Sequence, residues 1–266
     1  RVLFRSVQST LLDMLDDGTF LSIAEEWGLE ESICLSADNV VNDSDLAVDK
    51  GNFFVELGSV VSKLAEGMLA SLAIFVLTLV FSLPLGLLLM FVRLSKVNVI
   101  RWIAKIYISI MRGTPLMLQL LVVFFGPYYV FGISLSYSYR FYAVIIGFAL
   151  NYAAYFAEIF RSGIQAIPVG QSEAATVLGY TRAQTFVRII LPQMTRIVLP
   201  PVTNEVITLV KDTSLAFALA YTEMFTLAKQ IAAASASIMP LFIAGAFYYI
   251  FNFIVAWIME YIEKKM

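Results

Sequence analysis

The residues best placed to do chemistry lie inside an apolar segment, 194–222, that is long enough to cross a membrane. Its polar members are Asn204, Glu205, Thr208, Lys211 and Asp212. At about 100° per residue, these positions fall within roughly a third of a helix circumference. A charge at the centre of a membrane helix costs about 3 kcal/mol on insertion scales, so each charge here is a candidate site residue. The spacing predicts one polar stripe along a path through the membrane.

This stripe carries the groups that a zwitterion needs. Glu205 or Asp212 would face an ammonium group, and Lys211 would face a carboxylate. The surplus negative charge favours neutral polar or cationic amino acids over acidic ones, provided that both acids stay ionised. The alternative is structural, with the three charges satisfying one another or a partner helix at a subunit interface.

A second polar stripe is expected in the apolar segment 141–160. Asn151, Tyr155 and Glu158 are spaced i, i+4, i+7, so they share one helix face. Asn151 is a candidate substrate contact. For Glu158 the alternative is an ion pair with Arg161, three residues further on.

The residue types that are missing exclude most enzyme chemistry. The sequence has no histidine and one cysteine, Cys34, which excludes an intrachain disulfide, a Cys/His zinc site and a Ser-His-Asp triad. It also lacks a GxxxxGKS or GxxxxGKT motif, which would cradle nucleotide phosphates. We therefore expect no cofactor on this chain and no enzyme activity, and any ATP hydrolysis would come from a separate subunit.

Composition places the chain among polytopic membrane proteins. It has 266 residues, of which 60% are hydrophobic and 14% charged, with a mean hydropathy of +0.82. Because lipid cannot satisfy backbone polar groups, the expected fold class is all-α, with about five transmembrane helices. The five apolar segments are 67–92, 115–133, 141–160, 194–222 and 237–258.

Basic residues in the connections predict the orientation. Arg93, Lys96, Arg101 and Lys105 follow the first apolar segment, Arg161, Arg182, Arg188 and Arg196 follow the third, and Lys264 and Lys265 end the chain. The other connections carry mainly Arg140 and Lys229. Because cytoplasmic loops carry the excess of Lys and Arg, we expect the N-terminus outside and the C-terminus inside.

The connection between the third and fourth segments has the pattern of two short helices. Ser172 would cap the first helix, Gly179 would end it in the left-handed conformation, and Thr181 to Gln184 has capping-box spacing for the second. Pro192 would then lie where the chain turns back into the membrane. A polar helical hairpin between membrane spans is expected to dock another molecule.

This hairpin resembles the loop of ATP-binding-cassette (ABC) importer permeases, through Glu173-Ala174-Ala175, then Gly179, then Ile189-x-Leu191-Pro192. Three other stretches resemble permeases for polar amino acids: Arg112 to Leu116, Ala154 to Arg161 and Lys211 to Leu215. The resemblance implies a type I importer permease fold for residues 59–266. It also implies an assembly of two permease subunits, expected as a homodimer, and two ATPase subunits that hold ATP and Mg. The implied ATPase contacts are Gly170, Gln171, Glu173, Ala174, Ala175 and Gly179, whereas the alternative is a merely solvated loop helix.

The N-terminal segment differs in character from the rest. Of the 20 acidic residues, 12 lie in positions 1–58, which gives no support to nucleic-acid binding. Residues 7–28 resemble the C-terminal end of extracytoplasmic amino-acid-binding proteins, and the alternative is an ordinary amphipathic hairpin. The resemblance implies that 1–32 is the tail of a fused binding domain and that 33–58 is a linker.

Two functions from different classes compete at this point. The first is the membrane-spanning subunit of an ATP-driven importer for polar amino acids. The second is a secondary transporter that uses an ion gradient, with Glu205, Lys211 and Asp212 as ion or proton sites. A secondary transporter would be expected to show an internal repeat, and the sequence shows none.

Overall fold

The computed structural model describes residues 53–133, 136 and 138–265, together with residues 14, 17–19 and 22. Within these residues the chain is helical and contains no strand. The elements are α4 (Phe53–Arg93), α5 (Asn98–Gly113), α6 (Leu116–Phe131), α7 (Tyr139–Gln165), α8 (Val169–Val177), α9 (Arg182–Thr185), the π-helix η2 (Phe186–Ile190), α10 (Leu191–Asp212), the 3-10 helix η3 (Thr213–Leu219), α11 (Met224–Ser235) and α12 (Met239–Lys265). The predicted binding-domain tail and most of the predicted linker lie outside the described residues. Residues 53–58 of that linker belong to α4.

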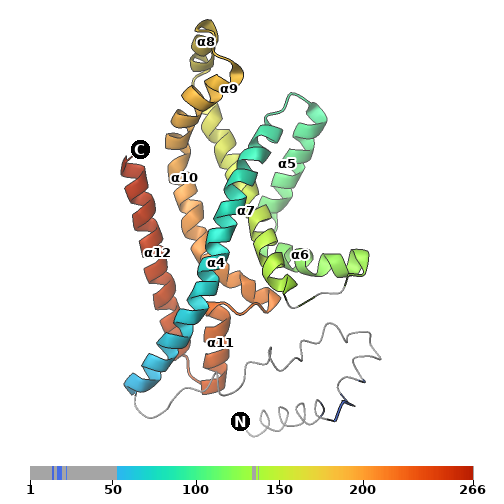
Figure 1. Ribbon diagram of the computed structural model, residues 1–266, viewed down its shortest axis with the longest axis vertical. Helices are drawn as coiled ribbons and strands as arrows, with labels where there is room; N and C mark the ends of the chain where they lie inside the picture. Colours follow the sequence, from blue (N-terminus) through green and yellow to red (C-terminus); the bar gives the residue numbers. More distant parts are fainter. Residues whose placement is uncertain are drawn as a thin grey trace.

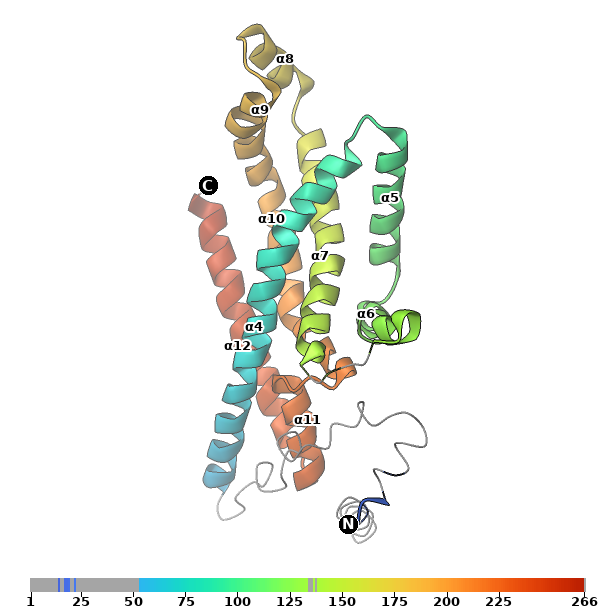
Figure 2. The same cartoon turned by 45° about the vertical axis from the view of Figure 1, so that its right-hand side comes forward.

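The long helices run side by side along the long axis of the molecule (Figures 1 and 2). These are α4, α7, α10 and α12, with α5 beside α7. The short helices α8 and α9 stand at one end, and α11 lies at the other end. The hairpin that we predict to dock a partner is therefore presented at a tip of the bundle.

Three of the described helices are long and apolar enough to cross a membrane: α4, α7 and α12. The bent pair α5 and α6 meets the same test together. By contrast α10 does not, because it carries the polar and charged residues of the predicted stripe. Its 22 residues nevertheless cover about 33 Å, enough to span about 30 Å of hydrocarbon, and it lies within the bundle.

The second and fourth spans differ from the prediction. We expected a span over 115–133, but α6 turns by 113° from α5 and lies across the long axis (Figure 1). Thr114 has the extended backbone (φ −120°, ψ 149°) that the following proline favours, so the helix stops there. Arg101 and Lys105, which we expected in a loop, therefore lie on α5. In the fourth span the α-helix ends at Asp212 and continues as η3.

The core is built around α7. Tyr152, Phe148 and Phe156 are at most 2% exposed and pack among the neighbouring helices. Two neighbouring helices, α4 and α10, pack closely on α7 at positions where one helix of the pair has a glycine. A Cβ at Gly163 would overlap Val198 of α10, and a Cβ at Gly86 would lie 2.7 Å from the Cβ of Phe156.

A second, smaller core joins α11 to α4 and α12. Its buried members are Val60, Leu64, Met224, Ala228, Ile231 and Ala244. The carboxylate of Glu223, which caps α11 directly before Met224 of this core, is 0% exposed. It accepts hydrogen bonds from Ser71 Oγ on α4 (3.3 Å) and from Tyr248 Oη on α12 (3.2 Å). This buried acid therefore links three helices.

Candidate functional site

The first candidate site is the tip formed by α8 and α9. Helix α8 begins at Val169, directly after Pro168, and no side chain caps it. The predicted cap at Ser172 is wrong, because the helix starts three residues earlier and Ser172 lies inside it. Proline before the first helical residue fixes the entry of the chain without a capping side chain.

The end of α8 follows the prediction. Gly179 has φ +78°, the left-handed conformation that glycine adopts without a Cβ penalty. The N–H of Tyr180 donates to the carbonyl of Ala175 (3.0 Å), and the N–H of Gly179 donates to that of Thr176 (3.0 Å). These two bonds form a Schellman motif, which satisfies the last carbonyls of the helix. The turn after α8 is thus fixed by the backbone alone.

The start of α9 also follows the prediction, but its continuation does not. Thr181 Oγ1 accepts from the N–H of Gln184 (3.3 Å), and Gln184 Oε1 accepts from the N–H of Thr181 (2.9 Å). This capping box confirms the predicted helix start. We expected a turn at Pro192, but the helix continues from α9 through η2 into α10, with Pro192 in the first turn of α10. Pro192 has no N–H to donate, and it lies directly after the π-helix, where the regular i→i−4 bonding of the run is already interrupted.

The predicted contact residues of the tip are mostly accessible. Gly170, Gln171, Glu173, Ala174 and Gly179 are exposed. Ala175 is 1% exposed, so it packs inside the hairpin and its side chain is not part of the outer surface.

The outer surface of the tip also carries apolar residues that the sequence analysis missed. Val169, Val177 and Leu178 are 73%, 87% and 73% exposed. Three aliphatic side chains this accessible on a nine-residue helix and its cap favour a protein-binding surface. The signal in the sequence was the aliphatic pair next to Gly179, at a position where a solvated loop would be polar.

The second candidate site is the polar stripe of α10, which the tertiary structure divides. Asp212 accepts a hydrogen bond from Tyr152 Oη of α7 (2.7 Å), so one acid is engaged with the core. Glu205 interacts electrostatically with Arg112 of α5, which carries the opposite charge, and with Asp212, which carries the same charge. Within the described residues, no ion pair joins Lys211 to either acid. Among the described residues, the stripe is therefore not held together by ion pairs within it.

Lys211 instead lines a hollow of about 350 Å³ between α10, α11 and α12. The other lining residues are Ser214, Phe225, Leu241, Ala244, Gly245 and Tyr248. The hollow pairs one ammonium group with two hydroxyl-bearing side chains on an otherwise apolar wall. Asn204 is exposed and Thr208 half-buried on the same helix, with Thr208 Oγ1 donating to the Asn204 carbonyl (2.9 Å).

Asn151 lies at the break between α5 and α6. Its Nδ2 donates to the carbonyl of Met111 (3.1 Å) and to Gln119 Oε1 (2.9 Å). Gln119 Nε2 donates in turn to Thr114 Oγ1 (2.8 Å) and to the Met111 carbonyl (2.9 Å). Asn151 is 4% exposed, and both protons of its amide are used inside the protein. These bonds satisfy the carbonyls that the end of α5 leaves open.

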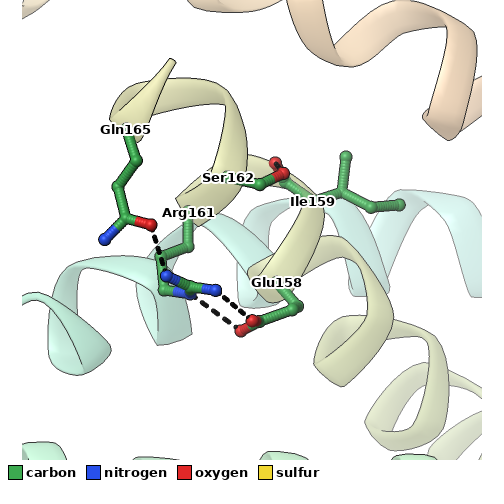
Figure 3. A network of polar contacts seen from close by, with 5 residues as sticks. All are labelled: Glu158, Ile159, Arg161, Ser162 and Gln165. Carbon is green, nitrogen blue, oxygen red and sulfur yellow. Dashed lines mark hydrogen bonds and ion pairs between the residues drawn. The ribbon is translucent and has the colours of Figure 1, made fainter. Parts of the chain in front are cut away.

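The predicted pairing of Glu158 with Arg161 is confirmed. Figure 3 shows the two side chains facing each other near the end of α7, with Gln165 accepting a further hydrogen bond from Arg161. Arg112 lies over the ring of Tyr155, 5.3 Å from its centroid. The polar groups of α7 thus meet those of α5 on one side and those of α10 on the other.

Comparison with protein families gives a match over residues 82–266. The family is described as "Binding-protein-dependent transport system inner membrane component". The chain is 36% identical over 205 residues to the L-cystine transport system permease protein TcyB of Bacillus subtilis, covering 76% of this chain and 86% of that protein. It is also 36% identical over 202 residues to the arginine transport system permease protein ArtQ of B. subtilis, covering 76% and 91%.

Solved structures show the same fold. The structure titled "Crystal structure of an amino acid ABC transporter with histidines" superposes with a TM-score of 0.71 and 28% identity, covering 80% of this chain and 97% of that one. The MetNI methionine ABC transporter superposes with a TM-score of 0.60 at 18% identity, covering 76% and 93%. The predicted class, an all-α membrane protein with the type I importer permease fold, is confirmed.

Proposed function

Because the chain belongs to the family of binding-protein-dependent transport system inner membrane components, we propose that it is the membrane-spanning permease subunit of an ATP-driven ABC importer for polar amino acids. It is a multi-pass protein of the plasma membrane. The observation that carries the proposal is the rigid, exposed tip of α8 and α9. Its turn is fixed by the Schellman motif at Gly179, and its outer surface carries accessible aliphatic side chains.

In this proposal the tip is the coupling element. Gly170, Gln171, Glu173, Ala174 and Gly179 contact a separate ATPase subunit that holds ATP and Mg. Ala175 contributes from inside, by packing the hairpin. Because α9, η2 and α10 form one continuous helical run, a displacement of the tip is transmitted directly to α10. The closing of the ATPases then shifts an equilibrium between two packings of the bundle.

The substrate path is assigned to the face of α10. Asn204, Glu205, Thr208, Lys211 and Asp212 contribute to it, and a second copy of this chain encloses the other side. The hollow around Lys211 supplies a cationic site for the substrate carboxylate. The hydrogen bonds of Asn151 and Asp212 support a positioning role for these two residues within the path.

The extracytoplasmic partner is an amino-acid-binding domain, fused upstream through residues 1–32. The N-terminus then lies outside and the C-terminus inside. Support comes from the basic residues, since Arg93, Lys264 and Lys265 all lie at the helix ends nearest to α8 and α9 (Figure 1).

The test reverses the charge of Glu173. Glu173→Arg should abolish ATP-driven uptake and the copurification of an ATPase, while the permease stays inserted. Glu263→Arg, at an exposed position on α12, is the matched control and should change neither. If Glu173→Arg transports normally, the coupling role is wrong. Uptake that stops when the ion gradient is collapsed at constant ATP would instead support the ion-gradient-driven secondary transporter.

A further inference from the structure

A basic hollow lies on the surface of the continuous run of η2 and α10, next along the chain to the α8–α9 tip. Its volume is about 330 Å³, and it is lined by Arg188, Ile189, Pro192, Gln193 and Arg196. Both arginines are exposed, and neither has an ion-pair or hydrogen-bond partner within the described part of the chain. Two unneutralised guanidinium groups on one hollow favour an anionic ligand with several acceptor oxygens.

Local backbone geometry produces this hollow. Phe186–Ile190 is a π-helix, which widens one turn of the run from α9 to α10. Gln193 Nε2 donates to the carbonyl of Ile189 (2.9 Å), which holds this side chain against the widened turn. Arg188 and Arg196 are eight residues apart, about 12 Å along the axis, so two long side chains can close on one group from either end.

Exposed aliphatic residues adjoin the two arginines along the chain. Val187 and Ile197, the sequence neighbours of the two arginines, are 58% and 42% exposed. A ligand that fits this combination has an anionic head and a hydrocarbon part. A free phosphate or carboxylate would leave these aliphatic side chains in contact with water.

The position along α10 corresponds to a membrane surface. Arg196 lies 16 residues, about 24 Å, from Asp212, the last residue of α10, and so lies near the end of α10 that joins the tip. The end of α12, with Lys264 and Lys265, lies toward the same end of the molecule in both views. Basic residues at this level lie where lipid phosphates are found.

We propose that Arg188 and Arg196 form a binding site for the phosphate of an acidic phospholipid, in the leaflet nearest to α8 and α9. The two guanidinium groups hold the phosphate oxygens, and the acyl chains run along Val187 and Ile197. A lipid bound here fixes the depth of the first turns of α10, directly below the tip. This site is separate from the substrate path and holds whether or not the chain imports amino acids.

The test measures lipid binding to the full chain, purified with whatever subunits accompany it. Native mass spectrometry counts molecules of phosphatidylglycerol or phosphatidylcholine that stay bound. The wild type should retain phosphatidylglycerol at least tenfold better than Arg188→Gln/Arg196→Gln. Arg101→Gln/Lys105→Gln removes the same charge from α5 and is the matched control, which should bind as the wild type does.

A second measurement does not depend on variants. Phosphatidylglycerol with a photoreactive acyl chain should crosslink to the peptide that contains residues 187–197 of the wild type. Equal retention by the double variant, equal retention of both lipids, or crosslinks only elsewhere would overturn the proposal. Displacement of the lipid by millimolar inorganic phosphate, with no dependence on acyl chains, would show a free-phosphate site and would also overturn it.

Discussion

Replacing Glu223 by alanine should weaken the joint between α4, α11 and α12 more than any other single polar change that we consider. The carboxylate is 0% exposed and accepts two backbone N–H groups, from Phe225 (2.6 Å) and Thr226 (2.7 Å). It also accepts the hydroxyls of Thr226, Ser71 and Tyr248. Hydroxyls can rotate toward other acceptors, but the two N–H groups cannot.

The magnitude follows from the donors that lose their acceptor. A buried donor without a partner costs about 1–3 kcal/mol, so the loss of the acceptor for two backbone donors gives about 2–6 kcal/mol. Each kcal/mol lowers the melting temperature of a chain of this size by about 2–4 °C. Glu223→Gln keeps one acceptor oxygen, so we expect about 1–3 kcal/mol. Tyr248→Phe removes one hydrogen bond and should cost about 1 kcal/mol.

The assay is thermal unfolding of the purified chain in detergent, followed by intrinsic fluorescence. The expected order of destabilisation is Glu223→Ala, then Glu223→Gln, then Tyr248→Phe. Glu263→Ala, at an exposed position of α12, is the control and should stay within about 0.5 kcal/mol of the wild type. A melting temperature of Glu223→Ala equal to that of this control would refute the reasoning.

Two further experiments test the packing and the hydrogen bonds of α7. Gly163→Ala places a Cβ against Val198 and should cost about 1–3 kcal/mol. At Gly126 a Cβ would meet no atom within 4 Å beyond the neighbouring residues and backbone of its own helix, so Gly126→Ala should be neutral or stabilise by up to about 1 kcal/mol. Equal melting temperatures of the two variants would contradict the close approach at Gly163. Asn151→Ala and Gln119→Ala should show a coupling energy of about 0.5–1.5 kcal/mol in a double-mutant cycle of unfolding, because their side chains share a hydrogen bond. Additive effects would mean that this bond contributes nothing.

Some features could be predicted from the sequence because they depend on residues within about one helical turn. The capping box at Thr181, the Schellman motif at Gly179 and the pairing of Glu158 with Arg161 each join positions at most five apart. Composition determined the membrane class in the same way, because the lack of water in lipid leaves helices as the only spans available.

Other features were decided only by the tertiary structure. The polar residues of the stripe on α10 lie on one face of the helix, as their spacing predicts. That face is wide enough for Asp212 to contact α7 while Lys211 lines a hollow with α11 and α12. Glu223 was not singled out, because its partners Ser71 and Tyr248 are 152 and 25 residues away. The face of a helix on which a residue lies is set by its spacing along the sequence. The partner of a buried polar group instead depends on which helices pack around it.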